Sequence, residues 1–218
     1  MTVLITGANR GIGRALHDHY SDAGVDVIGT CRDEMPTTGR WISLDVTEPN
    51  DVSALRGAMD DAPLDLLVCN AGVYPDKSAD LNNGYPADMW ADAFAVNVTG
   101  VFLTIQALLP NLALAVSPKI AIIPSQMASH TLAPGDSYIY RASKAAVLNV
   151  GRNLAVDLKP KGIAVGIYHP GWVQTDMGGT QASITMSQSA DGLVNRFAPL
   201  SLATTGCFET WDGRALPF

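Results

Sequence analysis

Short apolar runs alternate along this chain with longer stretches in which apolar residues recur at helical spacing. The short runs predict seven strands, at Val3–Ile5, Val25–Ile28, Trp41–Leu44, Leu66–Val68, Ile120–Ile123, Ile163–Tyr168 and, more weakly, Cys207–Thr210. The longer stretches predict helices near residues 11–23, 50–61, 87–115, 138–159 and 187–198. This alternation is typical of βαβ units, in which helices cover both faces of a parallel sheet. We therefore expect a single α/β domain over residues 1–218, doubly wound around a parallel sheet of about seven strands.

Composition and charge narrow the range of partners. Hydrophobic residues make up 47% of the 218 residues, which is enough for a substantial core. The formal net charge of −7 disfavours nucleic acid and anionic membranes as partners. Cys31, Cys69 and Cys207 have neither a disulfide-framework nor a zinc-ligand spacing, which argues against a metal site and indicates a reducing, cytoplasmic setting. We expect neither an export signal nor a membrane span, because no run of eighteen uninterrupted apolar residues occurs.

Two predicted helices are apolar on more than one face. Residues 101–116 contain only four interruptions of their apolar character, and residues 142–158 carry apolar side chains around much of the helix. A helix that packs on a sheet with one side normally keeps a polar outer stripe, so a missing stripe indicates a second burial partner. Another part of the same chain is one candidate. We favour a second copy, and therefore expect a homodimer or homotetramer formed through these two helices.

A glycine-rich turn directly follows the first predicted strand. It reads Thr6-Gly7-Ala8-Asn9-Arg10-Gly11-Ile12-Gly13, and a helical pattern opens at Ile12. Glycines there allow positive φ angles and let the backbone approach a pyrophosphate, which the free N–H groups of a helix start bind well. The spacing departs from the usual Gly-x-Gly-x-x-Gly fingerprint, so a purely structural turn is the alternative. In this Rossmann-type context we favour a dinucleotide held by Gly7, Asn9, Arg10, Gly11, Ile12 and Gly13.

Basic residues favour NADP over NAD as that dinucleotide. A site for NAD usually has an acidic residue about 20 positions beyond the glycine turn, where it accepts a hydrogen bond from the ribose 2′-OH. Here the second strand leads into Arg32, which together with Arg10 offers planar forks for a 2′-phosphate. The neighbouring Asp33 keeps NAD as an alternative. Asp45, after the third strand, either accepts from an adenine amine or caps the helix that begins near Asn50.

Tyr140 and Lys144 stand four residues apart near the start of a predicted helix, so both lie on one helix face. A nearby ammonium favours the ionised phenol, and we expect Lys144 to lower the pKa of Tyr140 from its usual value of about 10. An ordinary helix with a packed Tyr and a solvated Lys is the alternative. Ser125 follows another strand, and functional groups collect at the carboxyl ends of parallel strands.

These features together resemble the short-chain dehydrogenase/reductase family over essentially the full chain. The motifs follow the family's order: Thr6–Gly13, Asn70-Ala71-Gly72, Asn97 in a long helix, Ser125, Tyr140-x-x-x-Lys144, and Pro170-Gly171 with Thr175. Residues 171–179 and 206–213 are similar to the compact C-factor-like branch. The resemblance implies an oxidoreductase that transfers hydride between NADP(H) and a small carbonyl or alcohol substrate, such as an aldehyde, ketone or quinone.

The resemblance also implies individual roles. Tyr140 exchanges a proton with the substrate oxygen, and Ser125 hydrogen-bonds that oxygen. Lys144 lowers the pKa of Tyr140 and holds the nicotinamide ribose, while Asn97 organises a water that leads protons to Lys144. Further cofactor contacts are implied for Arg32, Asp45, Val46, Asn70, Ala71, Gly72, Tyr140, Lys144, Pro170, Gly171, Val173 and Thr175.

Some points stay open at this stage. Cys69 replaces an Asn that the family places before Asn70, and Ser129 competes with Ser125, which we prefer because it closes a strand. Residues 178–199 are expected to form a short substrate lid, which predicts an open pocket. A C-factor-like NAD(P)-binding signalling or sensing protein with little catalytic role is the main alternative function. An epimerase or dehydratase that uses bound cofactor is a third.

Overall fold

The computed structural model describes residues 1–82 and 84–218, which are built around a parallel sheet of seven strands. The strands are β1 (Thr2–Ile5), β2 (Asp26–Cys31), β3 (Arg40–Ser43), β4 (Leu66–Cys69), β5 (Lys119–Ile122), β6 (Ala164–His169) and β7 (Phe208–Thr210). Their order is β3-β2-β1-β4-β5-β6-β7, and each neighbouring pair is parallel. The winding reverses between β1 and β4, which creates a topological switch point at their carboxyl ends. The predicted doubly wound α/β fold class is confirmed.

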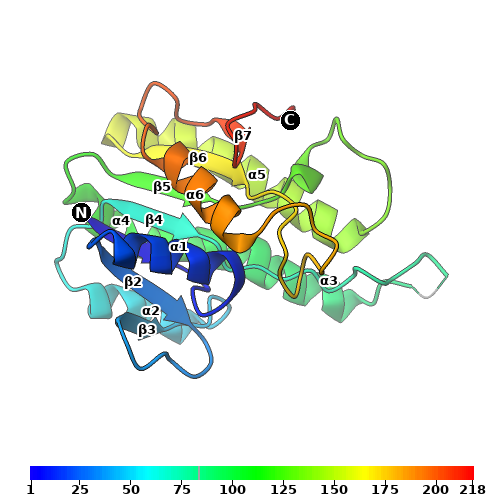
Figure 1. Cartoon of the computed structure of the whole chain (residues 1–218), viewed down its shortest axis with the longest axis horizontal. Coiled ribbons are helices and arrows are strands. Elements are labelled where there is room, and N and C mark those ends of the chain that lie inside the picture. Colours follow the sequence, from blue (N-terminus) through cyan, green and yellow to red (C-terminus); the bar gives the residue numbers. More distant parts are fainter. Residues whose placement is uncertain (83) are drawn as a thin grey trace.

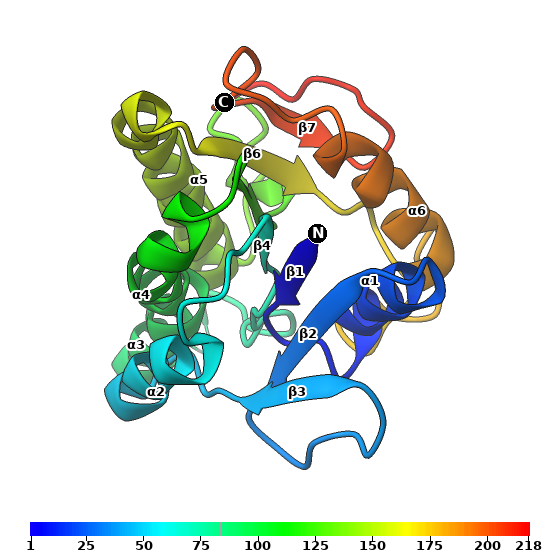
Figure 2. The same cartoon turned by 90° about the vertical axis from the view of Figure 1, so that its left-hand side faces the viewer.

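Helices cover both faces of this sheet (Figures 1 and 2). On one face lie α1 (Gly11–Asp22) and α6 (Met186–Phe197), and on the other lie α2 (Pro49–Met59), α4 (Val101–Ala113) and α5 (Tyr138–Leu158). Two short 3₁₀ turns occupy Gln126–Ala128 and Lys159–Lys161. Successive strand side chains point to opposite faces, so the inner strands β1, β2, β4, β5 and β6 supply both layers of the core. This two-sided burial explains why the strands appear in the sequence as apolar runs.

The predicted helix over 87–115 is a continuous helical run with a local irregularity. α3 (Ala87–Phe94) leads into a π-helical turn at Ala95–Gly100, which leads into α4. By length and composition alone, the run Ala87–Ala113 is apolar enough to cross a membrane. Here, however, its α4 part supplies fully buried residues such as Leu108 and Leu112 to the core beneath the sheet.

The segment expected to form the lid contains a core helix. In α6, Leu193 and Phe197 are fully buried and pack against the α1 side of the sheet. A reciprocal capping box between Thr185 and Gln188 fixes the start of this helix. The expected lid over 178–199 is therefore wrong in its second half, because the buried stripe of α6 makes it part of the main layer. A loop that precedes α6 is left to cover the site.

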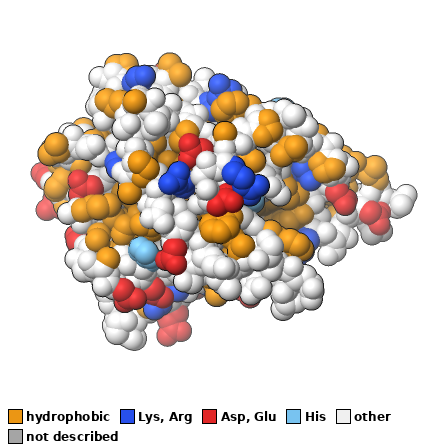
Figure 3. Space-filling model, turned by 45° about the horizontal axis from the view of Figure 1, so that its top comes forward, with side chains coloured by type: hydrophobic (Ala, Val, Ile, Leu, Met, Phe, Trp, Pro, Cys, Tyr) orange, Lys and Arg blue, Asp and Glu red, His pale blue; other side chains and the backbone are white. Residues whose placement is uncertain are grey.

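Charged side chains of both signs lie close together on the face that bears α6 and β7 (Figure 3). His19 Nδ1 lies 2.9 Å from Asp191 Oδ1, and Arg214 Nε lies 3.0 Å from Asp212 Oδ2. Exposed pairs of this kind contribute little to the free energy of unfolding. They do balance charge locally, so this face does not present the uniform negative field that the net charge alone would suggest.

Candidate active site

The glycine turn between β1 and α1 leaves the start of the helix open. Gly7 and Gly11 adopt φ angles of +63° and +57°, which residues with a side chain rarely reach. Arg10 precedes α1 in an extended conformation, and within the described part of the chain no side chain caps the first turn of α1. The N–H groups of this turn are therefore available to an anionic ligand.

The end of β4 braces the glycine turn from the neighbouring strand. Asn70 Nδ2 donates to the carbonyl oxygens of Thr6 and Gly7 at 3.0 and 3.1 Å. Thr6 Oγ1 accepts from the N–H groups of Asn70 and Ala71, both at 3.0 Å. A Cβ at Gly13 would lie 2.3 Å from the Gly7 oxygen, so glycine is required for the helix to approach this closely. The Asn70 amide thus shapes the turn through contacts that the sequence motif alone does not reveal.

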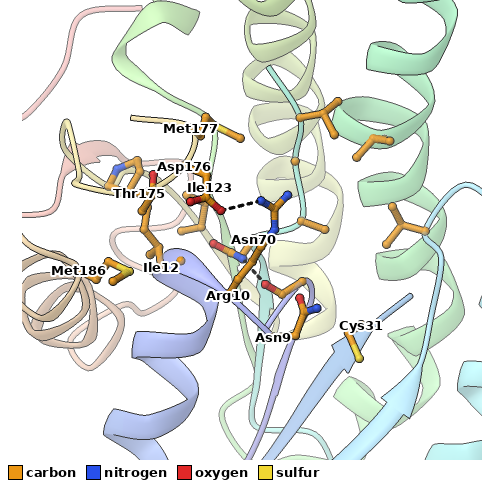
Figure 4. A pocket seen from close by; sticks show the side chains of 18 of the residues that line it. Asn9, Arg10, Ile12, Cys31, Asn70, Ile123, Thr175, Asp176, Met177 and Met186 are labelled. Atoms are coloured by element: carbon orange, nitrogen blue, oxygen red, sulfur yellow. Dashed lines mark hydrogen bonds and ion pairs between the residues drawn. The ribbon is translucent and has the colours of Figure 1, made fainter. Parts of the chain in front are cut away.

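Two arginines stand at the edge of the cavity next to this turn. Arg10 Nη1 pairs with Asp176 Oδ2 at 3.2 Å, which links the glycine turn to the loop after β6 (Figure 4). Arg32 Nε lies 3.7 Å from Asp33 Oδ2, and both side chains are more than half exposed. Both guanidinium groups are therefore held only by surface carboxylates, which an incoming phosphate could replace.

Asp45 has a local role that differs from one of its two predicted roles. Its carboxylate accepts from Thr47 N–H at 2.9 Å and from Thr47 Oγ1 at 2.7 Å. These hydrogen bonds hold the pKa of Asp45 below its usual value. The residue at the N-cap of α2 is Glu48, so Asp45 does not cap that helix. Asp45 still lines the cavity, where the predicted contact with an adenine stays a prediction.

Tyr140, Lys144 and Ser125 meet at the carboxyl end of β5. The Ser125 side chain acts on the Tyr140 phenol and lowers its pKa, and Lys144 Nζ lies 5.5 Å from the centre of the Tyr140 ring. Lys144 Nζ also donates to the carbonyl oxygen of Ile123 at 3.3 Å. Ser129 instead accepts from the N–H of Leu132 at 3.2 Å. The choice of Ser125 over Ser129 as the partner of Tyr140 therefore agrees with the geometry.

Burial governs the ionisation of this group. It raises the pKa of Tyr140 above its ordinary value, and nearby Tyr74 and Asp76 raise it further, while the Ser125 hydrogen bond lowers it. Burial also lowers the pKa of Lys144 to about 8. The expectation that the pKa of Tyr140 lies below its usual value is thus wrong for this structure, because burial is the largest influence on the phenol and raises its pKa. The spacing of the two residues predicted their proximity but not the depth of their burial.

Asn97 lies in the π-helical turn and has no exposed surface. Its Nδ2 donates to Val73 O and to Ser143 Oγ, both at 2.9 Å, and its Oδ1 accepts from Val73 N–H at 2.9 Å. A Cβ at Gly72 would lie 3.1 Å from Lys144 Nζ and 3.2 Å from Asn97 Oδ1, so both polar atoms face this glycine. Turns of the π type often occur at functional sites. Asn97 therefore ties α5 to the loop after β4, close to Lys144.

A cavity of about 880 Å³ runs along this edge of the sheet. Its wall includes the predicted residues Gly7, Asn9, Arg10, Gly11, Ile12, Arg32, Asp45, Val46, Asn70, Ala71, Gly72, Tyr140, Lys144, Pro170 and Thr175. Five other predicted residues are not part of the described wall, namely Gly13, Asn97, Ser125, Gly171 and Val173. The structure thus brings most of the predicted set together around one space, with the remaining five outside its lining.

The sequence analysis missed several residues of this wall. They include Cys31, Leu44, Ile123 and Pro124 at strand ends, and Gln174, Asp176, Met177, Gly179, Thr180 and Met186 before and at the start of α6. The residues at strand ends could have been found from their position alone, because the carboxyl ends of parallel strands form the ligand edge. The residues near α6 fall within the branch-like stretch 171–179 or the expected lid 178–199, but no chemical pattern gave them individual roles. Tyr74 and Asp76, which contact Tyr140 from outside the wall, were also missed.

The switch-point glycine turn and the polar groups at the neighbouring strand ends define a Rossmann-type α/β protein in which Tyr140 and Lys144 line a cavity of about 880 Å³. The sequence model of the short chain dehydrogenases matches residues 1–184, and the chain belongs to this family. The family resemblance found in the motifs is confirmed.

Two proteins are similar to this chain in sequence, and two solved structures are similar to it in fold. C-signal of Myxococcus xanthus is 36% identical over 157 residues, which cover 72% of this chain and 93% of that protein. The 1-hydroxy-2-glutathionyl-2-methyl-3-butene dehydrogenase of Rhodococcus sp. (strain AD45) is 32% identical and covers 99% of this chain and 98% of its own. The NADPH-bound carbonyl reductase from chicken fatty liver superposes with a TM-score of 0.91 at 28% identity, over 100% of this chain and 98% of that chain. The carbonyl reductase Sniffer of D. melanogaster superposes with a TM-score of 0.92 at 28% sequence identity, over 100% of this chain and 99% of that chain.

Proposed function

We propose that this protein is an NADPH-dependent carbonyl reductase acting on a neutral aldehyde, ketone or quinone. The observation that carries the proposal is the contact of Ser125 and Lys144 with Tyr140 at the wall of the cavity that the glycine turn opens. The likeness to NADPH-bound carbonyl reductase over the full chain supports the same conclusion.

The cofactor end of the cavity fits a phosphorylated dinucleotide. The backbone at Gly7 and Gly11 and the open first turn of α1 would hold the pyrophosphate. Arg10 and Arg32 would bind the 2′-phosphate with charge-assisted hydrogen bonds. When bound, NADPH supplies the hydride that reduces the carbonyl carbon.

The protein's own side chains manage the proton and the developing charge. Tyr140 donates its phenolic proton to the carbonyl oxygen, and Ser125 hydrogen-bonds that oxygen as negative charge grows on it. Lys144 provides positive charge beneath the phenol and would hold the ribose next to the nicotinamide. Asn97 Oδ1, which faces Gly72 together with Lys144 Nζ, suits a proton path that reaches Lys144 through water.

The substrate end supports a neutral ligand. Gln174, Met177, Thr180 and Met186 line it without charge. Asp176, the charged residue of the same loop, is paired with Arg10 beside the glycine turn. A buried carboxylate or phosphate on the substrate would find little compensation from these side chains, whereas an apolar carbonyl compound would bury surface against the two flexible methionines.

The test is a panel of aldehydes, ketones and quinones assayed for NADPH oxidation, with Tyr140→Phe as the decisive variant. We expect kcat/KM of Tyr140→Phe to fall by about 10²–10⁴-fold, because proton donation is lost, while the Kd for NADPH stays unchanged. Tyr138→Phe is the matched control, since Tyr138 begins the same helix but is 41% exposed and has no lysine four residues on. Wild-type protein that binds NADPH yet reduces none of the panel would contradict the proposal.

A second candidate function is favoured by the relative named C-signal, which is 36% identical to this chain. In that case the chain binds NAD(P) and acts through contact with a partner. The Tyr140→Phe variant separates the two functions, because a signalling effect that survives the loss of the phenol does not depend on reduction.

A further inference from the structure

The helix that carries Tyr140 and Lys144 is capped from a distant part of the chain. Asp76, in the loop after β4, accepts from Ile139 N–H at 2.8 Å and from Tyr140 N–H at 3.2 Å, although it lies more than sixty residues earlier. Its side chain is only 1% exposed. A carboxylate at the start of a helix binds free N–H groups and offsets the positive end of the helix dipole. One of the two N–H groups that Asp76 binds belongs to Tyr140 itself.

The backbone before this helix is held in an unfavourable conformation. Asp136 and Ser137 have φ angles of +69° and +54°, in the left-handed region that residues with a Cβ seldom adopt. Ser137 occupies the N-cap position, yet Asp76 supplies the cap. The Tyr74 hydroxyl hydrogen-bonds Ser137 Oγ and so helps hold this strained residue. Strain of this kind persists only where surrounding contacts over-determine it, and it occurs often at active sites.

The same loop also contacts the reactive ring. The Tyr74 ring stacks on the Tyr140 ring with 4.1 Å between ring centres and 19° between planes. Tyr74 does not itself line the described cavity, so it contacts the wall residue Tyr140 from the side away from the cavity lining. Tyr140 is therefore held at its backbone by Asp76 and at its ring by Tyr74.

Both ends of the loop are anchored to other parts of the site. At one end Val73 exchanges two hydrogen bonds with Asn97. At the other end Lys77 Nζ donates to Met177 O at 3.0 Å, in the loop that covers the cavity. The segment Val73–Lys77 thus connects the π-helical turn, the start of α5 and the covering loop.

We propose that Asp76 and Tyr74 are positioning residues that fix the placement of the Tyr140 phenol. This inference rests on the proposed function. Among the described residues, the ionisable groups that act on Tyr140 are Lys144 on its own helix and Tyr74 and Asp76 on the loop after β4. The Asp76 carboxylate disfavours the phenolate, so it keeps the proton on Tyr140 for donation to a carbonyl.

The decisive experiment measures the pH dependence of kcat/KM for Asp76→Asn in both reaction directions. The amide keeps the size of the side chain and one acceptor oxygen but removes the charge. Without the carboxylate the phenol loses its proton more readily. We therefore expect the alkaline limb of carbonyl reduction and the acid limb of alcohol oxidation both to move to lower pH, by about one unit.

Asp65→Asn is the matched control. Asp65 also accepts a backbone N–H from a distant residue, Thr2, at 2.7 Å, but it precedes β4 at the opposite edge of the sheet. The chemical change is identical to that in Asp76→Asn. We expect Asp65→Asn to lower the thermal midpoint without moving either limb, which separates an effect on Tyr140 from a general loss of stability.

Two variants of Tyr74 test the ring contact. Tyr74→Phe keeps the stack and loses the bond to Ser137, whereas Tyr74→Leu loses both. We expect Tyr74→Leu to lower kcat at least fivefold below Tyr74→Phe, with an unchanged Kd for NADPH.

The outcomes distinguish this inference from the proposed function. A wild-type protein that reduces no carbonyl compound overturns the proposed function. An active wild type whose pH limbs coincide in Asp76→Asn and Asp65→Asn overturns the inference alone. If Asp76→Asn does not fold, equal kcat values for Tyr74→Leu and Tyr74→Phe overturn it.

Discussion

Burial of Lys144 lowers the stability of the folded protein but places an ammonium group next to Tyr140. The residue is 5% exposed, its ammonium donates to the Ile123 carbonyl oxygen, and burial lowers its pKa to about 8. In the unfolded chain a lysine has a pKa of about 10.4, so folding at neutral pH moves a charge out of water. This unfavourable term belongs to the same side chain that provides positive charge beneath the Tyr140 phenol.

Replacing this lysine by an isosteric apolar residue should therefore stabilise the protein. We expect Lys144→Met to raise the free energy of unfolding at pH 7 by about 1–3 kcal/mol and to abolish carbonyl reduction. The folded-state pKa is lowered, so the unfolded state binds more protons between about pH 8 and 10.5, and wild-type stability rises with pH across that window. The advantage of Lys144→Met should shrink over the same range. Urea unfolding of cofactor-free protein at pH 7 and pH 10 measures both effects, and a constant advantage would contradict this account.

The sequence predicted those features of the site that depend on local helix geometry, and it did not predict those that depend on burial or on distant segments. The spacing of Tyr140 and Lys144 on one helix face predicted their proximity, because helical geometry is local. Their burial is a property of the whole fold, and for that reason the pKa of Tyr140 was predicted in the wrong direction. Asp76 left no signal, because the N–H groups that it binds belong to α5, a distant part of the chain.

At the scale of elements, the loop between β6 and α6 forms part of the cavity wall. It is tied to the glycine turn by the pair of Asp176 with Arg10 and to the loop after β4 by Lys77. Arg10 and Asp176 side chains are 67% and 85% exposed, so their attraction is weak and sensitive to salt. If Arg10 binds the 2′-phosphate of NADP, this phosphate must compete with Asp176.

Removing the competing charge should therefore favour the phosphorylated cofactor. We expect Asp176→Asn to lower the Kd for NADP two- to fivefold at low ionic strength and to leave the Kd for NAD unchanged. The gain should fade as salt screens the arginine. Fluorescence titration with both cofactors at two salt concentrations measures this. Asp191→Asn is the control, because its partner His19 lies on α1 away from the described wall. Weaker binding of NADP to Asp176→Asn would show that Asp176 supports the cofactor instead.

The sequence predicted where the helices lie better than it predicted their burial or their local irregularities. The predicted helix near 187–198 exists at Met186–Phe197, but its burial at Leu193 and Phe197 removes it from the expected lid. The predicted helix over 87–115 exists too, yet its apolar period gave no sign of the π-helical turn at Ala95–Gly100. Asn97 in that turn hydrogen-bonds Val73 from outside the helix, and periodicity within one segment does not record such contacts.

At the scale of the whole molecule, the two sides of the sheet differ in what they expose. The side with α1 and α6 bears paired charges (Figure 3). The opposite side exposes apolar side chains on its outer helices, with Phe102 on α4 at 40% and Val156 on α5 at 71%. Several further apolar residues of α4, such as Leu103 and Leu109, are only partly buried. Exposed apolar side chains also occur elsewhere, as at Trp172 and Met186, but the sequences of α4 and α5 are apolar on more than one face, and contiguous surfaces of that kind are typical of contacts.

We therefore propose that α4 and α5 form the interface of a homodimer or homotetramer, and expect sedimentation at micromolar concentration to give at least twice the monomer mass of 23.0 kDa. Phe102→Glu should shift the protein toward the monomer, because each copy would bury an unpaired carboxylate in an apolar contact. Met35→Glu adds the same charge at a residue that is 47% exposed in the loop between β2 and β3, and it should leave the mass unchanged. Wild-type protein that sediments as a monomer would mean that the apolar side of α4 and α5 serves another contact.

If Phe102→Glu is monomeric and still reduces carbonyl compounds, the cavity of one chain is sufficient for catalysis, as the placement of Tyr140, Ser125 and Lys144 within a single copy predicts.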